Sequence, residues 1–172
     1  MTSCGEYQSL LKSNDYNLVY KKAIEYYNKG DYQRAMNLLD GVRSVFVGQA
    51  KAQNIAYYRA FCSYNMKDYQ IASDLFKQFI QTYPESSFAE ECLYMMGFCD
   101  YKASPKPRLD QQVTEKAIRE FQLYLSRYPY SMRKDKVNTY MDEMRDKLSY
   151  KAYLSAKNYY CLLYTSDAAD DL

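Results

Sequence analysis

Apolar residues along this chain recur at the three- and four-residue spacing of a helix face, and short polar turns separate the runs. The clearest case is the segment 56–84, where one helical run ends at 65–67 and a second spans 71–80. Tyr83-Pro84 ends the second run, because proline cannot continue a helix. The apolar residues of the second run share one face: Ile71, Ala72, Leu75, Phe76, Phe79 and Ile80. The pattern predicts a helical hairpin.

The same pattern returns upstream and downstream of this hairpin. Ala23, Ala60 and Gly97 are spaced by 37 residues, and so are Ala35 and Ala72. A small residue in each helix, a Gly-Asp-Tyr-like turn and a closing proline form the tetratricopeptide (TPR) pattern. Because one such unit cannot bury its apolar face alone, units stack on each other. We therefore expect an all-α fold of TPR-like helix-turn-helix repeats, stacked as a right-handed superhelical solenoid.

The repeats set the expected organisation of the chain. The third unit carries eight extra residues around 104–109, where two prolines predict a surface loop. Near the C-terminus, Tyr153, Ala156 and Tyr160 resemble the start of a further repeat. The expected parts are a junction and tether at 1–15, a repeat domain at 16–160 (units about 16–48, 49–85 and 86–130, with a partial unit at 131–160), and a tail at 161–172.

The tail does not continue the repeat pattern. Its sequence resembles the translation of a sequencing-library transposon adapter. We therefore expect residues 161–172 to be non-native and the natural gene to continue past residue 160. The alternative is a genuine acidic tail.

Composition narrows the possible functions. The chain has 172 residues with 22 tyrosines, no histidine and no tryptophan. The absence of histidine removes the commonest general base and the commonest zinc ligand, so we expect no enzyme activity, no metal and no cofactor. A net charge of +2 is too weak to predict nucleic-acid binding.

The cysteines also favour a structural role. Cys92 and Cys99 are seven residues apart on one helix, too far to form a disulfide with each other. Cys62 and Cys99 share a register in adjacent units and could approach each other. We expect buried free thiols that pack as small apolar residues.

Aromatic residues repeat around the small residue of each first helix. They lie on one helix face at offsets −3, +1 and +4: Tyr20, Ile24 and Tyr27; Tyr57, Phe61 and Tyr64; Tyr94, Phe98 and Tyr101. Asn28 and Asn65, at matching places, could hydrogen-bond a peptide backbone. Because the first helices of stacked pairs line the concave surface, these eleven residues form a predicted groove for an extended or helical peptide. The alternative is that the aromatic rings mainly pack one helix on another.

The N-terminal sequence Thr2-Ser3-Cys4-Gly5 resembles the end of a bacterial lipoprotein signal peptide, in which the cysteine becomes lipidated. A complete signal has a basic start and an apolar stretch before that cysteine, and neither is present here. The alternative is an ordinary surface cysteine near the terminus.

Several of these features together resemble the BamD family, the TPR lipoproteins of the outer-membrane β-barrel assembly machinery. The resemblance rests on the Cys4 signal, the tyrosine-rich units and three short motifs, and it covers about residues 4–160. The abundance of tyrosine is similar to Bacteroidetes members. The motifs are Tyr83-Pro84-Glu85-Ser86, Tyr128-Pro129-Tyr130-Ser131 and the insert Arg108-Leu109-Asp110-Gln111-Gln112.

The resemblance implies a non-catalytic periplasmic scaffold, anchored to the outer membrane by a lipid on Cys4. The N-terminal repeats of the family receive the C-terminal segments of unfolded outer-membrane proteins. The C-terminal repeats, which we expect to be missing here, dock on the POTRA region of BamA. One alternative is a Tol-associated cell-division adaptor, which would show an N-terminal coiled coil. Others are a generic TPR interaction module and a chaperone-binding TPR, which would carry a Lys/Asn carboxylate clamp where this chain has Tyr and Phe.

Overall fold

The computed structural model describes the backbone of residues 3–170 and the side chains of residues 6–161. Every regular element in this part of the chain is an α-helix, which confirms the all-α prediction. The chain divides into two compact units, Met1–Cys99 and Asp100–Leu172. The helices are α1 (Ser3–Leu11), α2 (Tyr16–Asn28), α3 (Tyr32–Val42), α4 (Ala50–Asn65), α5 (Tyr69–Thr82), α6 (Ala89–Ala103), α7 (Gln112–Arg127) and α8 (Lys134–Asp170).

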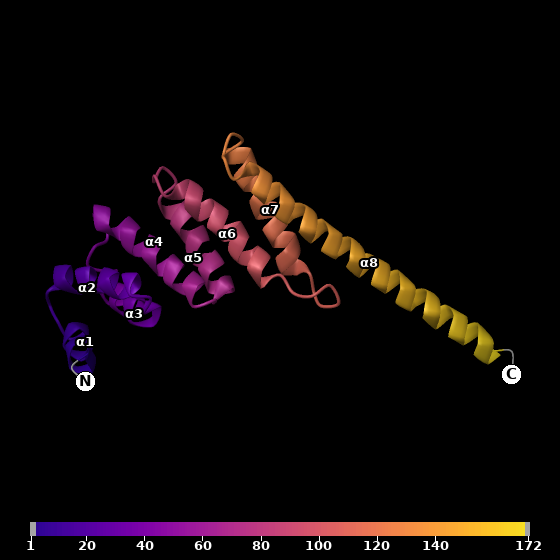
Figure 1. Ribbon diagram of the computed structural model, residues 1–172, viewed down its shortest axis with the longest axis horizontal. Coiled ribbons are helices and arrows are strands. Elements are labelled where there is room, and N and C mark those ends of the chain that lie inside the picture. The colour runs from indigo at the N-terminus through magenta and orange to yellow at the C-terminus, as the bar shows by residue number, and fades with distance from the viewer. Residues whose placement is uncertain (1–2, 171–172) are drawn as a thin grey trace. The chain divides into compact units, whose positions relative to one another are not determined.

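The first unit contains two helical hairpins, α2 with α3 and α4 with α5, and α3 also packs against α4 (Figure 1). Ala23, Ala35, Ala60 and Ala72 are fully buried, each with 0% of its surface exposed. A small side chain at these places lets two helix backbones approach closely. The 37-residue spacing thus identified the close contacts of the repeat correctly.

The turn inside each hairpin repeats as well. In the first hairpin the chain turns at Gly30 with φ +81°, and the Asp31 carboxylate accepts a hydrogen bond from the backbone N–H of Arg34 at 3.2 Å. This is the usual N-cap of a helix. In the second hairpin Lys67 takes the place of the glycine with φ 68°, and Asp68 precedes α5. Left-handed backbone favours glycine, so Lys67 holds a conformation that costs a side-chain-bearing residue some energy.

The segment expected to be a tether instead contains helix α1. Tyr7 and Leu10 lie three residues apart and share a face of this helix. Leu10 is buried in the core of the first unit, and the Tyr7 ring meets the Tyr26 ring at 6.0 Å. The amide of Asn37 donates a hydrogen bond to the Tyr7 hydroxyl at 3.0 Å. These contacts dock α1 on α2 and α3, so part of the segment expected as a junction and tether at 1–15 is a packed helix.

One further detail of the first unit differs from the sequence-based expectation. Ile71 is 56% exposed, although the spacing placed it on the apolar face of α5. It precedes Ala72 by one residue and lies about 100° away from it around the helix, which places it at the edge of the buried face. Helix α3 ends at Val42, and the chain turns through 43–49, where Phe46 is nevertheless buried.

The second unit is built on α7 and α8, which pack side by side (Figure 1). The predicted loop around 104–109 is confirmed as a non-helical connection between α6 and α7. The residues that α7 and α8 bury include Thr114, Ala117, Glu120, Phe121, Tyr124, Val137, Met141 and Met144.

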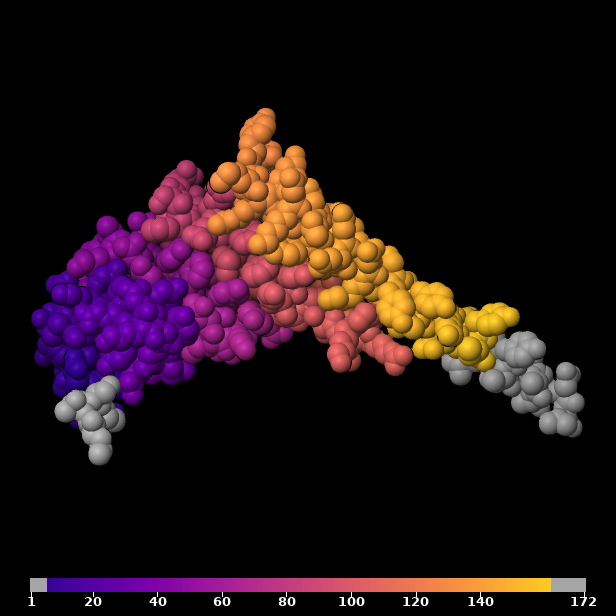
Figure 2. Space-filling model, viewed as in Figure 1, coloured from indigo at the N-terminus to yellow at the C-terminus, as the bar shows by residue number. Residues whose placement is uncertain are grey.

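Helix α8 continues without a break as far as Asp170. Its turns up to about residue 160 extend past α7 (Figure 2). No glycine or proline occurs between 134 and 160 to end it. Tyr153 and Tyr160, expected to open a further repeat, are 59% and 70% exposed on this helix. In the described part of the chain, these residues therefore extend α8 and form no separate hairpin.

Candidate functional site

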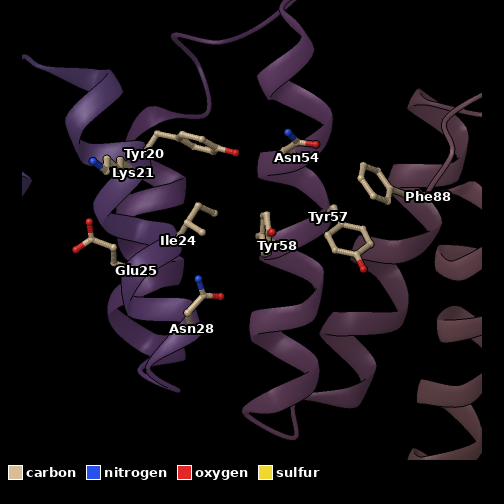
Figure 3. Close-up of a pocket in the computed structure, with 9 residues that line it drawn as sticks. All are labelled: Tyr20, Lys21, Ile24, Glu25, Asn28, Asn54, Tyr57, Tyr58 and Phe88. Atoms are coloured by element: carbon tan, nitrogen blue, oxygen red, sulfur yellow. The ribbon is translucent and has the colours of Figure 1, made fainter.

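A pocket of about 530 Å³ lies between α2 and α4 in the first unit (Figure 3). Tyr20, Ile24 and Asn28 form one row along α2, at the four-residue spacing of a helix face. The Tyr20 ring extends from α2 towards Asn54 of α4. The residues that line the pocket are Tyr20, Lys21, Ile24, Glu25, Asn28, Asn54, Tyr57, Tyr58 and Phe88.

Tyr57 forms the wall of the pocket on the α4 side. The centroid of its ring lies 4.5 Å from that of Phe61 and 4.7 Å from that of Phe88. Its hydroxyl donates a hydrogen bond to Glu91 Oε2 at 2.9 Å, which ties α4 to α6 within the first unit. Burial, followed by the bond to the Glu91 carboxylate, raises the pKa of Tyr57, so the phenol stays protonated. Tyr57 therefore lines the pocket with its aromatic ring, while its hydroxyl is already bonded to Glu91.

Tyr27 does not line the pocket. Its ring packs edge-on against Tyr32 of α3 at 5.5 Å and against Tyr58 of α4 at 4.9 Å. Burial raises the pKa of Tyr27 to about 12. Asn65 donates its side-chain amide to the carbonyl of Phe61 in its own helix at 2.8 Å. Tyr27 thus packs between α2, α3 and α4, and Asn65 bonds within α4.

The next predicted groove residues, on α4 and α6, also pack against other aromatic rings. Phe61 meets Phe76 of α5 at 5.1 Å, and Tyr64 lies 6.2 Å from Phe98 of α6. Tyr94 is buried and stacks on Phe98 at 5.7 Å. The Phe61–Phe76 and Tyr64–Phe98 pairs thus join neighbouring helices, while Tyr94 and Phe98 pair within α6.

Tyr101 falls in the second unit. Its ring stacks on Tyr140 at 4.5 Å, and its hydroxyl donates to Glu143 Oε2 at 2.5 Å. The hydrogen bond to the Glu143 carboxylate, helped by burial, raises the pKa of Tyr101 to about 12. Tyr101 thus links α6 to α8 in that unit.

Of the eleven groove residues, the pocket brings together Tyr20, Ile24, Asn28 and Tyr57. The sequence reasoning missed the other five that line it: Lys21, Glu25, Asn54, Tyr58 and Phe88. Lys21 and Glu25 are next to predicted positions, so a wider helix face would have included them. Asn54 lies one turn before Tyr57 and Tyr58. No helical register could have found Phe88, because it comes from the turn before α6.

The candidate lipid-attachment residue, Cys4, belongs to α1, and its side chain lies outside the described residues. Cys62, Cys92 and Cys99 are buried thiols that form no disulfide, as predicted. Burial raises the pKa of Cys62 and that of Cys92 to about 12, which keeps both as protonated, unreactive thiols.

Between residues 6 and 161 no cluster of side chains could hold a metal ion. None of the helices in the described part of the chain combines the length and the apolar character needed to cross a bilayer.

Comparison with known proteins identifies the relatives of this chain. Its sequence matches the model of the family described as YfiO, outer membrane lipoprotein, over residues 12–166. No curated protein matches the chain. The family is TPR-like and contains the BamD lipoproteins of the β-barrel assembly machinery, which agrees with the helical hairpins described above. Because the match spans most of the sequence, this chain belongs to the YfiO family of outer-membrane lipoproteins.

Proposed function

We propose that this protein is a non-catalytic scaffold of β-barrel assembly and that its α2–α4 pocket receives a segment of an unfolded outer-membrane protein. Membership of the YfiO family makes it an outer-membrane lipoprotein of that machinery. The observation that carries the more specific proposal is the lining of the pocket, which combines aromatic rings with two side-chain amides. Such a lining suits a peptide that presents an aromatic side chain and an unpaired backbone.

The size and chemistry of the pocket support this occupant. A volume of about 530 Å³ lies within the range of sites that hold small ligands or a few side chains. Tyr20, Tyr58 and Phe88 offer ring faces, while Asn28 and Asn54 can each donate and accept hydrogen bonds. An extended peptide has donors and acceptors on its backbone that match these amides. The aromatic C-terminal segment of an unfolded β-barrel protein has this chemistry.

The test is a titration of a fluorescent synthetic peptide that ends in Phe against three variants. Tyr20→Ala and Phe88→Ala each remove a ring from the pocket, and we expect each to weaken binding about tenfold, or about 1.4 kcal/mol. Tyr16→Ala is the matched control, since Tyr16 also belongs to α2, is exposed and does not line the pocket. Wild-type affinity in pocket variants that keep the wild-type circular dichroism spectrum would reject the proposal.

The protein partner that we propose is a BamA-like POTRA region. Family membership supports this partner, because the assembly machinery is built around it in the family that the sequence resembles. Isothermal titration of the full chain with the purified POTRA domains tests it. Absence of binding by the folded chain would argue against this partner.

We also propose Cys4 as the site of lipid attachment. The Thr2-Ser3-Cys4-Gly5 sequence and the lipoprotein family support it. Expression of the complete gene in a bacterium, followed by mass spectrometry of the mature N-terminal peptide, should show an acylated cysteine. A mature peptide that retains an unmodified Cys4 would exclude this site.

A further inference from the structure

The connection between α6 and α7 is fastened to α8 by a chain of hydrogen bonds within the second unit. Lys147 Nζ donates to Ser104 Oγ at 2.6 Å, and Ser104 in turn shares a hydrogen bond of 2.5 Å with the Thr114 hydroxyl. One turn further along α8, Lys151 Nζ donates to the carbonyl of Leu109 at 2.9 Å. Two lysines on one face of α8 therefore hold the beginning and the end of the connection.

A buried glutamine fixes the same connection from inside. Gln111 is 2% exposed, and its amide donates to the carbonyls of Lys106 at 2.8 Å and Leu109 at 3.2 Å. Its Oε1 accepts the Thr114 hydroxyl at 2.7 Å. Because the backbone is held at 106 and at 109, the position of Arg108 between them is set by the fold.

A pocket of about 300 Å³ lies between this connection and α8. It is lined by Pro107, Arg108, Lys151, Leu154, Ser155 and Asn158. The set contains two cationic groups, a hydroxyl, an amide and two apolar side chains, and none of these described residues is acidic. A guanidinium and an ammonium beside neutral donors form an environment that favours an anion.

The segments around the pocket strengthen this preference. Residues 102–111 and 147–158 together carry six basic side chains and a single acidic one, Asp110, which does not line the pocket. The chain as a whole has a net charge of only +2, so positive charge is concentrated here. The positive electrostatic potential of these residues attracts an acidic partner, and this attraction weakens as salt is added.

We propose that this pocket binds an aspartate or glutamate side chain on an exposed segment of a partner protein, with a neighbouring apolar residue of that segment packed on Pro107 and Leu154. Arg108 offers a forked pair of N–H donors that matches a carboxylate, and Ser155 and Asn158 can complete its hydrogen bonds. The apolar part of the lining distinguishes the pocket from a flat basic surface of the kind that binds a membrane. The surface is separate from the aromatic pocket and does not depend on the function proposed for that pocket.

The test uses the full chain and two blocked, fluorescein-labelled hexapeptides, one of alternating Glu and Leu and one of alternating Gln and Leu. Fluorescence anisotropy should show binding of the Glu peptide and at least tenfold weaker binding of the Gln peptide. Arg108→Gln should weaken the Glu peptide about tenfold. Arg119→Gln is the matched control, because Arg119 is an exposed arginine of α7 outside the pocket, and it should keep wild-type affinity.

Three results would overturn the proposal. Equal binding of the two peptides would show that no carboxylate is recognised. Equal affinity of the Arg108→Gln and Arg119→Gln variants would place the binding elsewhere. Tighter binding of inorganic phosphate, or of vesicles of phosphatidylglycerol, with the same dependence on Arg108 would replace the acidic protein segment by a phosphate-bearing ligand. Arg108 is exposed, so its replacement leaves the buried core of the unit unchanged.

Discussion

Two tyrosine hydroxyls in this protein are bonded to glutamates of neighbouring helices. Tyr57 donates to Glu91 in the first unit, and Tyr101 donates to Glu143 in the second. In each pair a neutral phenol meets a carboxylate, which makes a stronger bond than two neutral groups would. At the residue scale, this explains part of the tyrosine excess, since these positions use both the ring and the hydroxyl to join one helix to another. Phenylalanine would supply the ring alone.

The buried Tyr27 should make stability depend on pH in the alkaline range. Its folded-state pKa of about 12 is above the ordinary value of 10.0, so the unfolded chain loses the proton first. The stabilisation is complete below pH 10 and is lost progressively as the pH rises towards 12. In urea unfolding at several pH values, Tyr27→Phe should therefore show a smaller loss of stability than the wild type across this interval.

The control for this experiment is Tyr130→Phe, since Tyr130 is 97% exposed and contributes little packing. It should retain the wild-type loss of stability. Identical pH profiles for the wild type and Tyr27→Phe would show that Tyr27 is not the group responsible.

At the scale of the element, α1 is a helix too short to be stable by itself. Its nine residues are below the length at which isolated helices persist in water, so packing must hold it. Leu10 and Tyr7 provide that packing against the first hairpin. If Cys4 carries the lipid, this helix connects the membrane anchor directly to the repeat without a free linker.

Leucines 10 and 11 offer a matched test of α1 docking. Leu10 is 5% exposed and Leu11 is 48% exposed, although they are neighbours in one helix. We expect Leu10→Ala to lower the free energy of unfolding by about 2–3 kcal/mol through the cavity it leaves. Leu11→Ala should lower it by about 0.5 kcal/mol or less. Chemical denaturation followed by circular dichroism measures both, and equal effects would show that α1 is not docked as described.

Helix periodicity predicted the hairpins and their close contacts because these features are local or repeat at a fixed distance. The same reasoning misplaced Ile71, which lies at the edge of the face that its spacing suggested. It also missed α1, because this short helix is stabilised by tertiary contacts with the first hairpin. The pocket was only partly predictable, since the packing of Tyr64 and Phe98 and the arrival of Phe88 depend on neighbouring helices.

At the scale of the whole molecule, burial is distributed unevenly along the chain. Helices α2 to α7 and the first turns of α8 supply nearly all of the large buried apolar side chains in the described part of the chain. The later turns of α8 carry exposed tyrosines at 150, 153, 159 and 160. In repeat proteins, stability is approximately the sum of such local contacts. The free energy of local unfolding should therefore fall along α8 towards its C-terminal turns.

Hydrogen–deuterium exchange followed by mass spectrometry tests this gradient. Amides of residues 134–148, whose helix buries Val137 and Met144, should exchange slowly. Amides of 150–160 in the same helix should exchange considerably faster, because local unfolding there exposes little additional apolar surface. Peptides from α7 serve as an internal reference for the stable part of the unit. Uniform protection from 134 to 160 would contradict the gradient.

The two hairpin turns solve one geometric problem with different residues, Gly30 in the first and Lys67 in the second. Repetition therefore constrains the backbone more tightly than it constrains the side chain. The left-handed backbone at residue 67 costs a lysine more free energy than a glycine, so Lys67→Gly should raise the melting temperature. An unchanged or lower melting temperature would show that the lysine is already well accommodated. A higher melting temperature would mark this turn as a position where the natural sequence is less stable than its own repeat allows.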